Sequence, residues 1–332
     1  MDAVKRWIDV RQQRIRPIAF VVGVIKKFGD DRGGRLAALV AYYGFFSLFP
    51  ALLTLVTVLA FVLEDRPGLR EDIESSAIGQ FPVIGDSIAG VAGQPLTGNV
   101  TGIIVGLVGA LWAGLGAMQA AQDAMNEAWG VPRVDNPGFV AKRVRSLVML
   151  AVLGGMLIAT SALTQVIAAI EIFGPVSRAL LFVGSVMLTS AVFVVAFRVL
   201  TVADVTWRQL VPGAVVAGTG YAVLQLVGQW YVRRVLAGAE DTYGTFGVVI
   251  GLLSWLYLQA QLTMIGAEVN VVAARGLWPR SLFERTATDA DRTSLASKVK
   301  EAQIAPGMDV EISFTDAGTD DARPDVIRPP DS

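Results

Sequence analysis

Apolar residues fill six long stretches of the chain, and short polar segments separate them. The clearest stretch is 245–265, which carries no charged residue. At a rise of about 1.5 Å per residue, a helix of that length spans the roughly 30 Å of a bilayer's hydrocarbon core. The other predicted membrane helices cover residues 36–63, 100–128, 147–173, 179–200 and 212–232. The pattern predicts an all-α fold, a polytopic bundle of six membrane helices within residues 36–274.

Two prolines mark features of the predicted helices. Pro50 lies within the first helix and has no N–H group to donate to the carbonyl of Phe46, so we expect a helix kink there. The Ser47 hydroxyl is well placed to bond the local backbone. Pro212 suits the first turn of the fifth helix, where an N–H group would have no helical acceptor.

The two ends of the chain differ from its apolar middle. Residues 1–35 are basic, and their apolar run at 18–25 is too short to cross a bilayer, so we expect a short interfacial helix flanked by cations. The run lacks the small-residue pattern of a cleavable signal. Residues 275–332 carry scattered acids and prolines without sustained periodicity, which predicts a largely disordered tail.

Composition supports this architecture and narrows the chemistry. Hydrophobic residues make up 53% of the chain, which is typical of an integral membrane protein. The absence of cysteine and histidine excludes disulfides, thiolate or imidazole metal sites and Ser–His nucleophile pairs. No segment fits the nucleotide-binding pattern G-x-x-x-x-G-K-[ST]. We therefore expect neither an enzyme nor a resident metal or cofactor.

Positive charge is unequally distributed between the two sides of the predicted bundle. The N-terminal segment, the loop at 129–145 and the residues after 274 share one side and carry most of the lysines and arginines. Basic residues favour the cytoplasmic side of a membrane, so both termini are predicted to be cytoplasmic.

Polar side chains gather on one face of the second predicted helix. At about 100° per residue, Gln119, Gln122, Asp123 and Asn126 share an arc of about 100°. Lipid offers these groups no hydrogen-bond partner, so the arc should face the interior of the bundle.

The sixth predicted helix carries a comparable set of polar residues. Gln261 and Glu268 are seven residues apart on one face, and Asn270 lies on another. Such side chains either form interhelical hydrogen bonds, each stabilising by about 0.6–2 kcal/mol, or line a substrate path or proton relay. The candidates for a substrate path are Gln119, Asp123, Asn126, Gln261, Glu268 and Asn270.

Cations in the loops have two interpretations. They fix the orientation of the protein in the membrane, or they contact anionic lipid headgroups. The candidates for headgroup contact are Arg133, Lys142, Arg143, Arg145, Arg233 and Arg234.

Four segments resemble the YihY/BrkB family of bacterial inner-membrane proteins, and within it the YhjD-like subgroup. They are ALVAYYGFFSLFP at 38–50, LWAGLGAMQAAQDAMNEAWG at 111–130, VPGA at 211–214 and YGTFGVVIGLLSWLYLQAQLTMIGAEVN at 243–270. The resemblance covers approximately residues 30–275. The family's motif positions in this sequence are Tyr42, Ser47, Pro50, Trp112, Asn126, Tyr243, Gly244, Trp255, Tyr257, Gly266, Glu268 and Asn270.

The resemblance implies a six-span protein of the bacterial inner membrane with a proposed role in exporting lipids or other amphiphiles. It implies no agreed substrate. An old family label, tRNA-processing ribonuclease, does not suit this sequence. The chain has no histidine or cysteine, no acidic cluster with metal-ligand spacing in a soluble segment, and no predicted cytoplasmic domain for RNA.

Three functions are compatible with these features. The first is a transporter or exporter of a lipid or another amphiphilic or small-molecule substrate. The alternative is a non-transporting scaffold for envelope machinery that docks through its tail, and a third is a membrane enzyme acting on a lipid headgroup. Membrane lipids are the expected partners and nucleic acid is not, while the sequence leaves a homo-oligomer and an envelope protein partner open.

Overall fold

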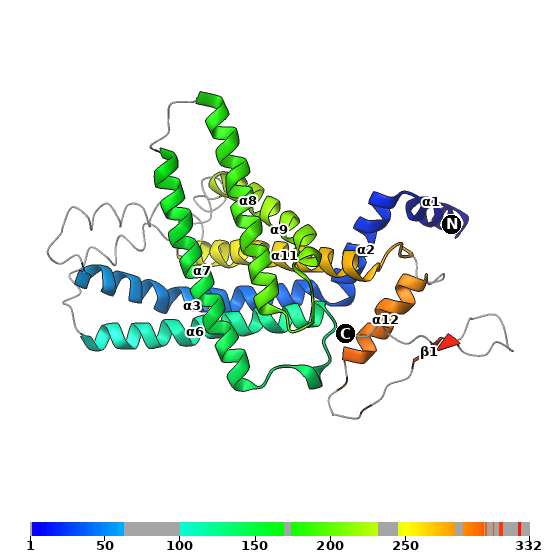
Figure 1. Cartoon of the computed structure of the whole chain (residues 1–332), viewed down its shortest axis with the longest axis horizontal. Coiled ribbons are helices and arrows are strands. Elements are labelled where there is room, and N and C mark those ends of the chain that lie inside the picture. The colour runs from blue at the N-terminus through cyan, green and yellow to red at the C-terminus, as the bar shows by residue number, and fades with distance from the viewer. Residues whose placement is uncertain are drawn as a thin grey trace. The chain divides into compact units, whose positions relative to one another are not determined.

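The computed structural model describes residues 2–62, 100–168, 174–231, 245–282 and 288–301, with a few residues nearer the C-terminus (Figure 1). In chain order its helices are α1 (Asp2–Arg14), α2 (Arg16–Asp30), α3 (Gly33–Val62), α6 (Val100–Ala128), the 3₁₀ turn η1 (Arg133–Asp135), α7 (Phe139–Ala168), α8 (Gly174–Leu200), α9 (Trp207–Tyr231), α11 (Thr245–Arg275) and α12 (Asp289–Glu301). Two short strands, β1 (Ser313–Phe314) and β2 (Asp325–Val326), pair antiparallel with Ser313 opposite Val326. Apart from this strand pair, the described chain is helical, as predicted.

Two helices contain a candidate membrane span by length and apolar composition. These spans are Phe182–Leu200 in α8 and Val249–Arg275 in α11. These two spans refer to the described residues alone, and they do not confirm the predicted number of six spans. The six-span count therefore stays a prediction.

Three helices, α7, α8 and α9, begin at least five residues earlier than their apolar stretches, α8 at Gly174 rather than at residue 179. α7 begins at Phe139 rather than at residue 147, because its first turns carry charged residues that an apolar window leaves out. α9 begins at Trp207, so the interpretation of Pro212 as a first-turn residue was wrong and this proline lies inside the helix. The start of α9 is set by the Thr206 N–H group, which donates to Gln209 Oε1 at 2.7 Å, one half of a capping box.

The first long helix continues through its proline. α3 is one helical element from residue 33 to residue 62, and it includes Pro50. The Ser47 hydroxyl donates to the carbonyl of Gly44 at 2.7 Å, and not to the Phe46 carbonyl that Pro50 leaves without a donor. The predicted kink itself stays a prediction.

The helix α12 was not expected from the sequence. Residues 289–301 lie in the segment predicted to be largely disordered, but they form a helix. The buried side of α12 consists of small or polar residues, namely Asp291, Ser294, Ala296 and Ser297. An apolar stripe is the signal that predicts a docked helix, so a helix that docks through polar groups gives no such signal.

Contacts within the chain define two compact units. The first unit comprises residues 1–36, 122–219 and 262–332, and the second comprises residues 37–121 and 220–261. The described parts of α1, α2, α7, α8 and α12 belong to the first unit, while α3, α6, α9 and α11 contribute residues to both.

A glycine lies just after the C-terminal end of α6, and another lies just after that of α11. Gly130 after α6 and Gly276 after α11 have positive φ angles of 61° and 63°, which favour glycine because it has no Cβ. The N–H group of Val131 then reaches back to the Asn126 carbonyl at 2.9 Å, and that of Leu277 to the Val272 carbonyl at 3.2 Å. Both ends are Schellman motifs, which satisfy carbonyls left over at a helix C-terminus.

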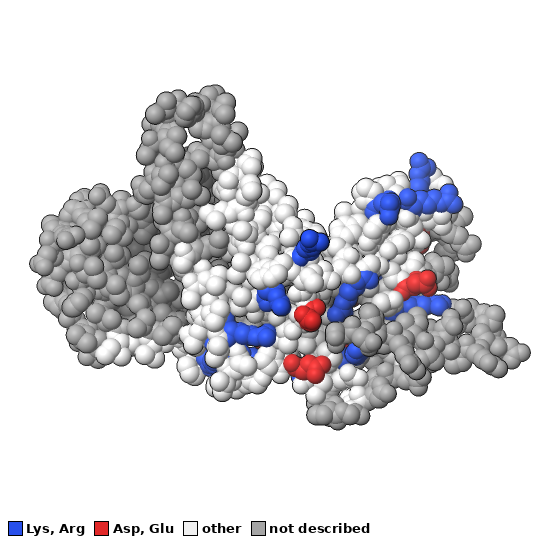
Figure 2. Space-filling view, viewed as in Figure 1, with Lys and Arg blue, Asp and Glu red and all other residues white. Residues whose placement is uncertain are grey.

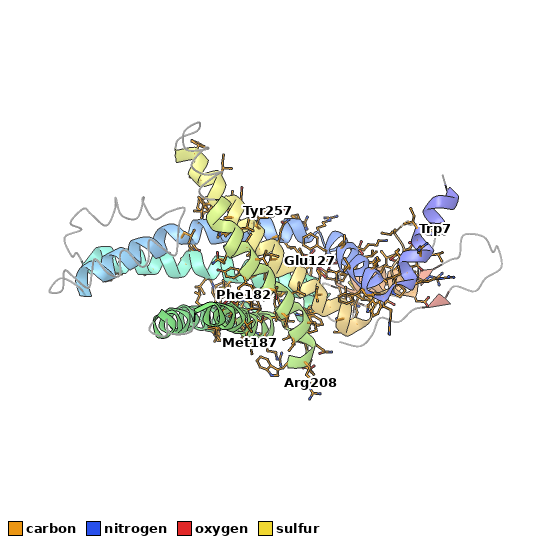
Figure 3. The ribbon with its side chains drawn as sticks, turned by 90° about the horizontal axis from the view of Figure 1, so that it is seen from above. Trp7, Glu127, Phe182, Met187, Arg208 and Tyr257 are labelled. Atoms are coloured by element: carbon orange, nitrogen blue, oxygen red, sulfur yellow. The ribbon has the colours of Figure 1, made fainter. Side chains whose placement is uncertain are left out.

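The exposed surface of the long helices is apolar. On α8, Phe182 and Met187 are exposed, Met187 by 69% (Figure 3). Glu268 and Asn270 on α11 are fully buried. This distribution, with apolar groups outside and polar groups inside, suits a surrounding of lipid rather than water.

Within the first unit, α9 and α11 pack with their backbones in close contact. A methyl group added to Gly213 would collide with the Gly266 carbonyl oxygen and with the Asn270 amide. A methyl group added to Gly266 would lie 2.8 Å from the Gly213 carbonyl oxygen. Small residues at such contacts let membrane helices approach closely.

We expect the substitution Gly213→Ala to destabilise the protein by about 1–3 kcal/mol, because the added methyl group meets backbone atoms that have no free space to move into. Gly184→Ala in α8 is the matched control, since a methyl group there has no neighbour within 4 Å. The thermal midpoint of each purified variant measures the effect. Equal midpoints for the two variants would contradict the close contact between α9 and α11.

Candidate functional site: a buried cluster of ion pairs

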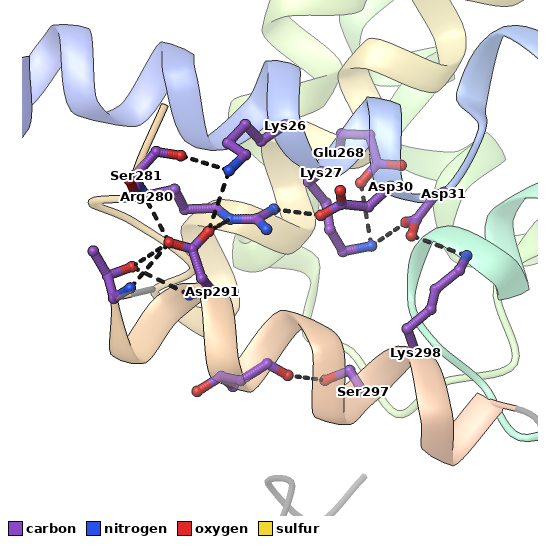
Figure 4. A network of polar contacts seen from close by, with 12 residues as sticks. Lys26, Lys27, Asp30, Asp31, Glu268, Arg280, Ser281, Asp291, Ser297 and Lys298 are labelled. Atoms are coloured by element: carbon purple, nitrogen blue, oxygen red, sulfur yellow. Dashed lines mark hydrogen bonds and ion pairs between the residues drawn. The ribbon is translucent and has the colours of Figure 1, made fainter. Parts of the chain in front are cut away.

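The most unusual side chain of the first unit is Lys27, which lies on the inward face of α2 and is buried. Its ammonium group donates to Asp31 and to the carbonyl oxygen of Ala128 at 3.0 Å. It also forms an ion pair with Glu268, with 3.6 Å between Nζ and Oε2 (Figure 4). Lys27 therefore joins α2 to the C-terminal end of α6 and to α11. A cation also interacts favourably with the partial negative charge at the end of α6.

Glu268 is the buried carboxylate of this cluster. It lies on α11, inside the candidate span, and neither of its carboxylate oxygens accepts a hydrogen bond. Among the described residues, its oppositely charged neighbour at ion-pair distance is Lys27, which also pairs with Asp31. A carboxylate in such a place is less completely neutralised than a carboxylate in a hydrogen-bonded pair.

The helix α12 adds a second lysine to the cluster. Lys298 Nζ lies 3.1 Å from Asp31, 3.4 Å from Glu127 and 3.4 Å from Glu301. Burial lowers the pKa of Lys298, but the negative charges of Asp31, Glu301 and Glu127 together outweigh it, and the pKa is raised above its ordinary value. Burial raises the pKa of Glu301, and Lys298 offsets this only in part.

The charged groups line a narrow recess of about 200 Å³, a volume that includes its open mouth. The Arg275 guanidinium also stacks over the Trp129 ring, 5.8 Å from its centroid. The recess brings three cations and three acids together among its lining residues, which are Lys27, Asp31, Glu127, Gly130, Arg275, Ser294, Ser297, Lys298 and Glu301.

A neighbouring set of ion pairs fixes the segment that follows α11. The buried Arg280 donates to Asp291 on α12 and to Asp30 at the end of α2, each at 2.7 Å. Asp291 also accepts from the backbone N–H group of Ser281 at 3.0 Å. Burial acts to raise the pKa of Asp291, but its hydrogen bonds to Ser281, Arg280 and Thr288 together outweigh burial, and the pKa is lowered.

The N-terminal helix joins the same segment. Asp9 on α1 accepts from the Ser281 hydroxyl and from the Leu282 N–H group, each at 2.7 Å. Burial acts to raise the pKa of Asp9, but these bonds lower it. These polar contacts therefore connect residues from both ends of the chain.

Two of the predicted path residues are buried asparagines. Asn126 Oδ1 accepts from the Val202 N–H group at 3.0 Å, and its amide donates to Asn136 at 3.3 Å. Asn270 Oδ1 accepts from the Gly213 N–H group at 2.7 Å, while its amide nitrogen has no hydrogen-bond partner. Both connect helices or loops through these hydrogen bonds, and Asn270 keeps a free donor.

The polar arc of α6 divides into a buried part and an exposed part. Gln122 is buried and donates to Ser146 at 2.8 Å. The expectation that Asp123 faces the interior was wrong, since 54% of its side chain is exposed and it pairs with Lys142 at 2.6 Å. Asp123 lies at the edge of the arc, where α7 presents a lysine.

The other two path candidates belong to the second unit. Gln119 and Gln261 are partly buried there, whereas Asp123, Asn126, Glu268 and Asn270 belong to the first unit. A path lined by all six residues stays a prediction.

The cations predicted to contact headgroups have varied surroundings. Arg133 is exposed in η1. Lys142 pairs with Asp123, Arg143 lies over the Phe139 ring, and Arg145 donates to the Thr201 carbonyl at 3.4 Å. Arg233 and Arg234 fall outside the described residues.

Sequence reasoning missed the centre of the cluster. Lys27 was interpreted as a flanking cation of an interfacial helix, and its i, i+4 spacing from Asp31 was the one local signal that could have identified the pair. The pairs of Lys298 with Asp31 and of Arg280 with Asp30 gave no such signal, because these partners lie in distant segments. In the part of the chain that the structure describes, no group of acids is arranged to hold a metal ion.

We expect Lys27→Met to destabilise the protein by about 3–5 kcal/mol, since it leaves two buried carboxylates without their shared cation. Lys142→Met is the matched control, and its exposed pair with Asp123 should cost no more than about 1 kcal/mol. Equilibrium unfolding in mixed detergent measures both. A loss for Lys27→Met as small as that of the control would contradict the buried pairing.

The attachment of α12 should depend on pH in the acid range. Because the pKa of Asp291 is lowered below its ordinary value of 3.8, its contribution to stability is present above that value and is lost as pH falls through the lowered pKa. Amide exchange protection of residues 289–301, corrected for intrinsic rates, should therefore fall only below about pH 3.8. Asp291→Asn should lower this protection already at neutral pH and remove its acid-dependent step. Persistence of the step in that variant would assign it to another group.

A known family and several known proteins are similar in sequence to this chain over most of its length. Residues 24–288 match the family described as "Virulence factor BrkB". The "Putative ribonuclease-like protein YfkH" of Bacillus subtilis is 25% identical over 267 residues, which cover 77% of this chain and 95% of that protein. The "Inner membrane protein YhjD" of Escherichia coli is 24% identical over 274 residues, or 77% and 81% of the two chains.

A third relative is the "UPF0761 membrane protein Smlt0865" of Stenotrophomonas maltophilia, 27% identical over 288 residues. They cover 81% of this chain but 64% of that protein, so this chain spans less than two thirds of its length. No solved structure matches the chain. The ribonuclease-like name belongs to one relative at low identity, and the other two are named as membrane proteins. Because the family match covers most of the sequence, this chain belongs to the BrkB family of membrane proteins.

Proposed function

We propose that this protein is a transporter or exporter of a lipid or another amphiphilic or small-molecule substrate in the bacterial inner membrane. The proposal includes six spans and two cytoplasmic termini. The single observation that carries it is Glu268, a fully buried carboxylate inside a candidate span whose oxygens accept no hydrogen bond. An ionisable residue at such a position is costly, and in membrane proteins it commonly marks a substrate or proton path.

The surroundings of Glu268 supply a way for the site to change state. Lys27 is shared between Glu268 and Asp31, so a closer approach to either carboxylate weakens its bond to the other. Lys27 is carried by α2, a helix of 15 residues, and not by a long helix of the bundle. A substrate group or proton that neutralises Glu268 would release Lys27 toward Asp31, and such two-state elements are what couple binding to movement.

Two further buried polar atoms of the first unit support a path for a polar headgroup. The amide nitrogen of Asn270 and the side-chain oxygen of Gln122 are buried and have no hydrogen-bond partner. Buried polar atoms of this kind are uncommon in folded proteins and call for an explanation. Transient bonds to a passing substrate would satisfy them.

The scaffold alternative depends on a tail that is free to bind a partner. Residues 289–301 already bind their own chain through Lys298 and Asp291. Removing residues 302–332 is therefore the informative truncation, because it keeps α12 in place. A scaffold should lose partner recovery in this variant, whereas a transporter should keep most of its activity.

We expect Glu268→Gln to slow transport by at least about tenfold, equivalent to about 1.4 kcal/mol of barrier. The amide removes the charge at nearly constant volume. Movement of a fluorescent phospholipid analogue in vesicles containing purified protein provides the assay, and a lipid comparison of deletion and wild-type cells identifies better substrates. Asp204→Asn is the control, because its carboxylate is exposed and it is not a path candidate. Equal rates for wild type and Glu268→Gln would refute the role of Glu268.

A further inference from the structure

The helix α2 turns its apolar side outward. Val21 is 53% exposed and Ile25 is 65% exposed, and Ile18 on the same side is also exposed. The opposite side, with Gly23 and Lys27, is buried against the protein. A helix at the surface of a water-soluble protein has the reverse arrangement, so the outward side of α2 needs an apolar surrounding.

The helix α1 continues this surface and adds cations. Trp7 is 60% exposed, and the guanidinium of Arg11 lies 5.0 Å from the centroid of its ring. Arg14, one turn further on the same side, is exposed as well. Figure 2 shows Lys and Arg side chains grouped on the surface over α1. Asp9 points the other way, since it is buried against Ser281.

The helix α2 packs beside the segment that directly follows the candidate span in α11. A methyl group on Gly23 would lie 3.0 Å from the Leu277 carbonyl oxygen, just beyond the end of α11, and the Phe20 ring meets the Trp278 ring at 5.8 Å. The candidate span in α11 ends at Arg275. With 15 residues, α2 is about 22 Å long, too short for the roughly 30 Å of a hydrocarbon core.

We propose that α1 and α2 form an in-plane membrane anchor that binds anionic phospholipid. The apolar side of α2 inserts among the acyl chains, and Arg11 and Arg14 bind headgroup phosphates. Exposed tryptophan and arginine beside an apolar helix face are the groups that interfacial helices use. The arginines favour an anionic lipid surface over a second apolar protein surface. The inference holds whether or not the protein transports a substrate.

The insertion can be tested on the full-length protein in lipid nanodiscs. Because the native chain has no cysteine, single spin labels can be attached through Val21→Cys and Ile25→Cys, which replace exposed side chains. Asp289→Cys, on an exposed position of α12, is the aqueous control. Labels at 21 and 25 should collide with oxygen several times more often, relative to a water-soluble nickel complex, than the label at 289. Free access of nickel to residues 21 and 25, or shielding from both reagents by protein, would overturn the proposal.

The preference for anionic lipid needs a separate test. The double variant Arg11→Gln with Arg14→Gln should lower the affinity for phosphatidylglycerol by roughly fivefold for each arginine, measured as lipid retained in native mass spectrometry. Arg11→Lys with Arg14→Lys keeps the charge and should retain most of this binding. Equal retention of phosphatidylglycerol and phosphatidylcholine by the wild type, or unchanged retention in the Gln variant, would overturn the role of the arginines.

Discussion

A lysine that is taken out of water must be surrounded by acceptors, because the desolvation of an ammonium group costs several kcal/mol. Lys27 meets this requirement with the carboxylate of Asp31, the last-turn carbonyl of Ala128 and the carboxylate of Glu268. Those acceptors come from α2 and its C-cap, from α6 and from α11. Asp31 in turn accepts from Lys298 on α12. Contacts centred on one buried charge thus connect four separate segments of the chain.

The helix α2 joins the buried Lys27 to the surface that is proposed to contact the membrane. Its inner side carries Lys27, and its outer side is apolar. The glycines after α6 and α11 stop both helices beside the cluster, so that backbone carbonyls and charged groups gather at one end of the first unit. A change in the membrane contact of α2 would therefore act directly on the ion pair of Glu268. Under the proposed function, lipid composition and the state of the buried carboxylate are linked through one short helix.

The sequence predicted the long helices well and the polar contacts poorly, for physical reasons. Apolar stretches have a length that the bilayer imposes, so the helices were located, although α7 and α9 begin earlier where charged or capping residues such as Thr206 extend them. The burial of Glu268 followed from the cost of charge in lipid. Its pairing with Lys27 could not be predicted, because a polar contact between distant segments leaves no periodic pattern. The helix α12 was missed for the same reason, because its buried side is polar. Asp123 was misplaced because a residue at the edge of a polar arc can face either the interior or the surface.

The central claim is that Lys27 and Glu268 are partners, and a double-mutant cycle tests it most directly. The free energies of unfolding of the wild type, Lys27→Met, Glu268→Gln and the double variant give the coupling energy between the two side chains. We expect losses that are not additive, with a favourable coupling of at least about 1 kcal/mol, because Lys27→Met leaves a buried charge without its cation only where Glu268 is still present. Additive losses would contradict it and would leave Glu268 without a functional partner at this site.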